Sequence, residues 1–217
     1  MINSQDLIGL SATPFAIGYH QIIMANTFGD ILSDSKNYDL IPEIVFVKYN
    51  SEPSYSQKRS VMAISDNFKR RARYNKLITD NPKYYDVITY LSTELMAEGH
   101  REIVIVKTKE QVNNVSKSLF DRGIENIKFF SQQKVVDKKK DMCLVATYDY
   151  AGAGFDYKEL SACIIATPLA GRKSLIQVTG RILRSSPGKP NPKLFILIDT
   201  AYDHVFLKDM DVATKIL

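Results

Sequence analysis

Short, mainly apolar runs alternate with helix-like stretches through most of this chain, and this alternation constrains its fold more than any other feature. Strand-like runs lie at residues 44–49, 103–106, 127–130, 142–146, within 160–166, and at 194–198. Helix-like stretches lie at residues 84–98, 108–123 and 174–183. Apolar strands that alternate with helices predict an α/β fold in which a parallel sheet is covered by helices on both faces.

The composition is that of an ordinary folded protein. The chain has 217 residues, of which 45% are hydrophobic and 24% charged, enough for one sizeable α/β domain with appendages. Its net charge of +5 is compatible with a polyanionic partner but does not require one. Cys143 and Cys163 fall in apolar strand-like runs, which favours reduced thiols, and no spacing suggests a metal site. Without a membrane-length apolar run or a signal peptide pattern, we expect a cytoplasmic protein with no membrane partner.

Three polar residues near residue 180 have the spacing of a phosphate-binding site. Gln177 lies one helical turn before Arg181, and Arg184 lies three residues further on, so all three are expected on one helix face. Two guanidinium groups and an amide can hold a polyphosphate and stabilise the charge that develops as its terminal group leaves. On their own, two arginines three apart would rather indicate a basic amphipathic helix whose arginines are solvated.

The neighbouring residues favour the phosphate site because they resemble a known family. Residues 177–184, Q-V-T-G-R-I-L-R, resemble motif VI of superfamily 2 helicases, Q-x-x-G-R-x-x-R. Residues 146–147 together with 154–156 resemble motif V, and residues 10–14 resemble the end of motif III, so three motifs follow the family's order. The spacing of seven residues from Thr147 to Gly154 and the sequence G-R-I-L-R resemble the corresponding motifs of RecG-like and phage UvsW-like branch-migration helicases.

The resemblance implies a nucleotide-binding role for several residues. It makes Arg184 the arginine finger for a γ-phosphate on another lobe, Arg181 a second donor, and Gln177 a polar partner of the phosphates or of water. Gly180 would let a backbone approach closely, although it is also simply a weak point in a helix. Gly154 would allow a tight turn and Asp156 would accept from the ribose or anchor the arginines. The alternative, a dinucleotide or methyl-donor loop, lacks the third glycine and does not directly follow its strand.

A second group of residues is predicted to contact nucleic acid. Thr147 matches the motif V threonine, and Thr108, with Lys107 and Lys109, matches the motif IV position. Hydroxyls and lysines on backbone phosphates give affinity with little base specificity. Both threonines, like Asp199, fall at the carboxyl end of a predicted strand, where parallel sheets bind ligands. For Thr108 the alternative is an ordinary helix N-cap.

The family pattern also implies parts that are not found in these residues. Ser11 and Thr13 match motif III, which couples the phosphate state to lobe closure. Upstream of it the family has a glycine-rich phosphate loop and a D-E-x-H segment for Mg²⁺, and neither occurs in the 217 residues. We therefore expect the C-terminal half of an ATP-dependent DNA helicase, inactive alone, with ATP and Mg²⁺ bound mainly by a first lobe. The alternative is a non-catalytic nucleic-acid-binding or partner-docking module.

These expectations give a provisional division of the chain. Residues 1–28 would be a remnant of the first RecA-like lobe and a linker, residues 29–205 the C-terminal RecA-like domain, and residues 206–217 a tail. Residues 51–82, basic and poor in aliphatic side chains, are interpreted as an insertion that is partly helical and partly flexible. Its charge fits a solvated helix face or a nucleic-acid contact. The expected partner is single-stranded or branched DNA, with RNA as the alternative. The expected location is the host cytoplasm if the protein is phage-encoded.

Overall fold

The computed structural model describes residues 42–129, 143–152, 157–168 and 172–206, all within a compact unit that spans residues 39–217. Several predicted features lie outside the described residues. These are the first-lobe remnant with Ser11 and Thr13, the motif V residues Gly154 and Asp156, and the C-terminal tail beyond Phe206. In the described part of the chain, no helix is both long and apolar enough to cross a membrane.

A six-stranded sheet forms the centre of the molecule, with the strand order β1-β6-β5-β2-β4-β3 and parallel pairing between all neighbours. Its strands are β1 (Glu43–Tyr49), β2 (Glu102–Val106), β3 (Asn126–Phe129), β4 (Cys143–Thr147), β5 (Ala162–Ile165) and β6 (Lys193–Asp199). Each lies where an apolar run predicted it, and the parallel sheet is confirmed.

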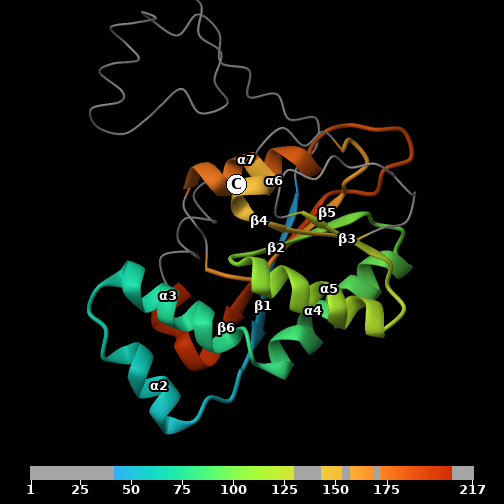
Figure 1. Ribbon diagram of the computed structural model, residues 1–217. Helices are drawn as coiled ribbons and strands as arrows, with labels where there is room; N and C mark the ends of the chain where they lie inside the picture. Colours follow the sequence, from blue (N-terminus) through green and yellow to red (C-terminus); the bar gives the residue numbers. More distant parts are fainter. Residues whose placement is uncertain (1–41, 130–142, 153–156, 169–171, 207–217) are drawn as a thin grey trace, which may run out of the picture. The chain divides into compact units, whose positions relative to one another are not determined.

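Helices cover the sheet on both faces, as the sequence predicted (Figure 1). The helices α4 (Pro82–Ala97) and α5 (Lys109–Asp121) lie together on one face, and α6 (Tyr148–Gly152) and α7 (Arg172–Ile182) lie on the other. Asn81 caps the start of α4, where Pro82 has the backbone angle a first helical turn needs. Gly99 follows α4 with a φ of 78°, a left-handed conformation that suits glycine at a helix end.

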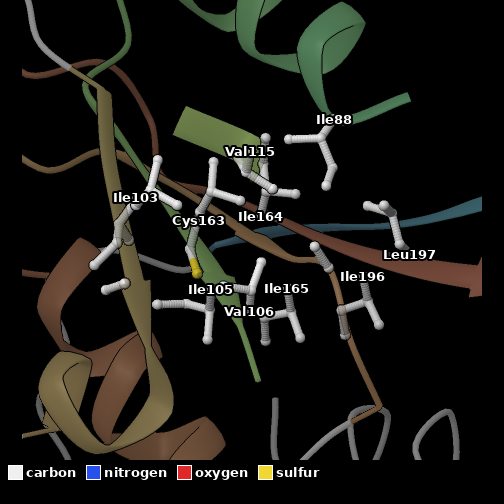
Figure 2. Packing of buried hydrophobic residues seen from close by; sticks show 14 of the residues in the cluster. Ile88, Ile103, Ile105, Val106, Val115, Cys163, Ile164, Ile165, Ile196 and Leu197 are labelled. Carbon is white, nitrogen blue, oxygen red and sulfur yellow. The ribbon is translucent and has the colours of Figure 1, made fainter. Parts of the chain in front are cut away.

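The core lies between the sheet and these helices. All five residues of β2 and of β4 are buried, which explains why their sequences are almost uniformly apolar. Figure 2 shows Ile88 of α4 and Val115 of α5 gathered beside Ile164 of β5. The cysteines of β4 and β5 are buried, unpaired thiols within this layer.

Residues 51–82, the predicted insertion, are largely helical and contribute to the core. They form α2 (Tyr55–Met62), α3 (Asn67–Ile78) and the start of α4. The buried ring of Tyr74 packs edge-on against two rings from the segment after β6. The ring centroids lie 5.2 Å apart for Tyr202 and 5.3 Å apart for Phe206. The helical part of the prediction is confirmed; that the segment is an insertion stays a prediction.

Asp199, the last residue of β6, is buried by the same packing. Its carboxylate accepts hydrogen bonds from the backbone N–H groups of Ser51 (3.2 Å) and Ala201 (3.0 Å) and from the Tyr74 hydroxyl (3.4 Å). The Asp199 side chain has no exposed area. Its carboxylate joins α3 to the segments that follow β1 and β6, and it therefore has a structural role at a strand end where the fold could also place a ligand site.

Candidate nucleotide and nucleic-acid sites

The two threonines predicted to contact nucleic acid lie at the carboxyl ends of neighbouring strands. Thr147 is the last residue of β4 and pairs in register with Val106, the last residue of β2. Thr108 follows two residues after Val106 and begins α5. The structure therefore brings together the motif IV and motif V residues that the sequence assigned to one function.

Thr108 is an N-cap, the alternative that the sequence left open. Its hydroxyl oxygen accepts from the backbone N–H of Gln111 at 3.1 Å, and the Gln111 side-chain oxygen accepts from the N–H groups of Thr108 (3.2 Å) and Lys107 (3.0 Å). Lys107 and Lys109 are exposed on either side of this cap. A helix N-terminus between two lysines attracts phosphate, so capping and phosphate binding are compatible at this position.

On the other side of the sheet, Gln177 and Arg181 lie four residues apart within α7, and both are half-buried. The helix ends at Ile182, so Arg184 follows the helix and is exposed. This differs from the prediction that placed all three residues on one helix face. The physical reason is that residues three and four apart share a face only within a helix, and Arg184 lies beyond the last helical residue.

Lys189 holds the segment that carries Arg184. Its amino group donates to the carbonyl oxygen of Arg184 at 2.5 Å and to that of Lys158 at 3.4 Å. Burial, reinforced by the positive charge of Arg184, lowers the pKa of Lys189 to about 8. Lys158 precedes β5, so Arg184 lies near the amino ends of the strands, away from the carboxyl ends that bear Thr108 and Thr147.

Gly180 lies in α7 between Gln177 and Arg181. A side-chain carbon added there would meet nothing within 4 Å. No described part of the chain therefore makes the close backbone approach that the family resemblance implies, and this role stays a prediction. No group of three His, Cys, Asp or Glu side chains in the described ranges could hold a metal ion.

Two residues of these sites were missed from the sequence. Gln111 had a signal, because Thr-x-x-Gln before an amphipathic stretch is the pattern of a capping box. Lys189 had none, since its two acceptors are backbone carbonyls, one of them 31 residues away.

No family model matches this chain. Two curated viral proteins are similar to parts of it. It is 24% identical over 171 residues to the transcript termination protein A18 of Yaba monkey tumor virus, covering 72% of this chain and 35% of that protein. It is 26% identical over 131 residues to the probable helicase D10 of Escherichia phage T5, covering 56% of this chain and 29% of that protein.

The fold is similar to that of a solved structure, T4 UvsW, with a TM-score of 0.56 and 19% identity, over 82% of this chain and 37% of that chain. This chain thus spans about a third of the length of each of these three proteins. The order of the motifs, the parallel sheet and these matches agree with one another. The chain resembles the C-terminal RecA-like lobe of superfamily 2 helicases, with T4 UvsW as a structural neighbour.

Proposed function

We propose that this chain is the second lobe of an ATP-dependent DNA helicase or translocase, with branched DNA as a proposed substrate. The observation that carries the proposal is the separation of the two candidate sites across one sheet. Thr108 and Thr147 lie at the carboxyl ends of adjacent strands, whereas Arg184 lies beyond α7 near the amino ends. A motor needs this separation, because it must hold its track and its nucleotide at the same time.

In this proposal the lobe completes a nucleotide site instead of forming one. ATP, bound with Mg²⁺ mainly by a first lobe, would supply the free energy that drives movement. Arg184 is exposed and Arg181 half-buried, so both side chains can be reached by a nucleotide at the domain surface. Their guanidinium groups would stabilise the negative charge that grows on the phosphates during hydrolysis. Gln177 would orient water or a phosphate oxygen, and Gly154, Asp156 and Gly180 would complete the pocket.

The nucleic-acid side would bind the sugar-phosphate backbone. Lys107 and Lys109 would neutralise phosphates, and the start of α5 and the Thr147 hydroxyl would donate to phosphate oxygens. None of these groups reads a base edge, so affinity should depend on salt far more than on sequence. Ser11 and Thr13 are proposed to couple the nucleotide state to the closure of the two lobes.

The proposal is tested by comparing the 217-residue chain with a protein that also carries a first lobe with a phosphate loop. ATP hydrolysis is measured with and without single-stranded DNA. We expect turnover that DNA stimulates in the two-lobe protein and none in the 217-residue chain. DNA binding without turnover in the two-lobe protein would instead favour the non-catalytic binding module. Turnover by the 217-residue chain would contradict the assignment of the phosphate loop to another lobe.

A further inference from the structure

The helical hairpin formed by α2 and α3, residues 55–78, carries the excess positive charge of the chain. It contains seven Lys or Arg residues and one Asp, a net charge of +6, whereas the whole chain carries +5. All the other residues together therefore carry a net charge of −1. A charge concentrated in this way in 24 consecutive residues points to a polyanionic partner.

The basic residues of this helical hairpin have two different surroundings. Three arginines are half-buried and donate to acceptors within the fold: Arg70 to the carbonyl of Ile64, Arg71 to that of Val205, and Arg73 to the hydroxyl of Ser60. The other four, Lys58, Arg59, Lys69 and Lys76, are exposed, and their side chains form no ion pair with another described residue. The arginines hold the hairpin in place, while the exposed group faces solvent.

Exposed aromatic rings lie among these charges. Phe68 near the start of α3 and Tyr55 at the start of α2 are each 81% exposed, the highest values for large hydrophobic side chains in the described part of the chain. Phe68, Ala72 and Lys76 are exposed at intervals of four residues, so they form one solvent-facing stripe along α3, with Lys69 beside Phe68. An exposed ring costs free energy in water, and a ring between lysines can stack on a base while the lysines bind phosphates.

The stripe leads to the site already described. The Gln111 side chain donates to the carbonyl oxygen of Asn75, beside Lys76, at 3.2 Å, and its oxygen accepts from the backbone of Thr108. The Asn114 amide donates to the carbonyl of Thr79, just after α3, at 3.3 Å. Figure 1 shows α3 beside the end of the sheet where β6 finishes, close to the start of α5. The exposed stripe of α3 from Phe68 to Lys76 therefore ends beside the cap of α5, which Lys107 and Lys109 flank.

We propose that this surface binds single-stranded nucleic acid, with a base stacked on Phe68 and phosphates on Lys69 and Lys76, and extends the track that begins at Thr108. The inference rests on the proposed function, since it lengthens the same nucleic-acid site. Single strands fit better than a duplex because only unpaired bases can stack on a protruding ring. Stacking accepts any base, so the surface should be tolerant of sequence.

Binding is measured by fluorescence anisotropy with labelled single-stranded DNA, single-stranded RNA and duplex DNA, between about 50 and 200 mM salt. Removing two phosphate contacts in Lys69→Gln/Lys76→Gln should make the slope of log affinity against log salt shallower by about 1.4. Phe68→Ala should weaken single-strand binding about tenfold with the slope unchanged, and Phe68→Tyr should restore it. Phe120→Ala and Lys117→Gln, which alter an exposed ring and an exposed lysine near the far end of α5, are the matched controls.

A second measurement locates the strand. Cys143 and Cys163 are buried, so the thiol of Ala72→Cys, on an exposed position, should react selectively with a thiol probe. Single-stranded DNA should slow this reaction, and should not slow the reaction of Lys117→Cys. If the parent chain binds single-stranded DNA and the variants at Phe68, Lys69 and Lys76 bind it as the control variants do, the proposed binding surface on the hairpin is wrong and the proposed function is untouched. A parent chain that binds no nucleic acid would overturn the nucleic-acid part of the proposed function as well.

Discussion

Gln111 is hydrogen-bonded to Asn75, and this contact joins the basic hairpin to the cap of α5. The Gln111 amide nitrogen lies 3.2 Å from the Asn75 carbonyl oxygen, while its amide oxygen accepts from the backbone N–H groups of Lys107 and Thr108. The side chain is fully buried. A single residue therefore sets both the start of α5 and the position of α3 beside it.

Replacing Gln111 should destabilise the lobe. Gln111→Leu leaves two backbone N–H groups and one carbonyl without their partner, and each unsatisfied buried group costs about 1–3 kcal/mol. We expect the free energy of unfolding in urea to fall by roughly 2–4 kcal/mol. Gln57→Leu is the matched control, because Gln57 forms the same capping box with Ser54 on the exposed surface of α2. Equal losses in the two variants would contradict this account.

Glu102 should make stability depend on pH. This carboxyl is fully buried, and burial raises its pKa to about 7, with Ser92 and Cys143 opposing the shift. Neither of its oxygens has a well-formed hydrogen bond from a residue that the structure describes. Because the folded state binds the proton more tightly, this contribution to stability is largest below about pH 4.5 and is lost as the pH rises to about 7, by roughly 3 kcal/mol.

Glu102→Gln removes that titration. Relative to the parent, we expect the variant to be more stable at about pH 8, with the difference shrinking as the pH falls toward 5. Urea unfolding of both proteins across this range gives the comparison, and the difference between them cancels the other titrating groups. Parallel pH profiles would show that the Glu102 carboxyl is not desolvated in solution.

Gly180→Ala separates the two interpretations of that glycine. Since an added methyl group meets nothing within 4 Å, alanine should stabilise α7 by about 1 kcal/mol in thermal unfolding of the 217-residue chain. If Gly180 is needed for a close approach to the nucleotide or to a first lobe, ATP turnover of the two-lobe protein should nevertheless fall. Unchanged turnover would leave Gly180 as a helix residue without a role in the site.

Arg184→Lys tests the arginine finger. Lysine keeps the positive charge but loses the planar fork, and supplying such an arginine is worth roughly 10³–10⁵ in rate in GTPases. We expect a large loss of ATP turnover in the two-lobe protein, with DNA affinity and thermal stability almost unchanged. Arg122→Lys is the control, because Arg122, the C-cap of α5, is exposed and forms an ion pair with Asp86 of α4. Similar turnover in both variants would reject the assignment.

The parts of the fold predicted well from sequence are those where burial leaves a periodic pattern. The residues of β2 are buried on both faces, so the run Ile103–Val106 is purely apolar and could be recognised without its neighbours. The packing of the hairpin was harder to predict, because α3 contributes few side chains to the core. Its many basic residues also interrupt the periodic pattern of apolar residues that would indicate a buried face. The buried position of Tyr74 depends on Tyr202 and Phe206, more than 120 residues away.

The candidate sites show the same division. Sequence spacing placed Thr108 and Thr147 at strand ends, because a strand end is a local property. The end of α7 at Ile182 agrees with the helix predicted over residues 174–183. The spacing of the motif nevertheless suggested that Arg184 shares the helix face of Gln177 and Arg181, and that interpretation was wrong. The hydrogen bonds from the Lys189 amino group to the carbonyl oxygens of Arg184 and Lys158 depend on tertiary structure, so no local sequence pattern predicted them.

The uneven charge of this lobe has a kinetic consequence. A molecule whose net positive charge lies in one helical hairpin is oriented by the field of a nucleic acid before the two molecules touch, so that the hairpin makes the first contact. The effect extends over about 8–10 Å at physiological salt. The hairpin would then govern how often an encounter is productive, and its charge would appear in the association rate constant more than in the lifetime of the complex.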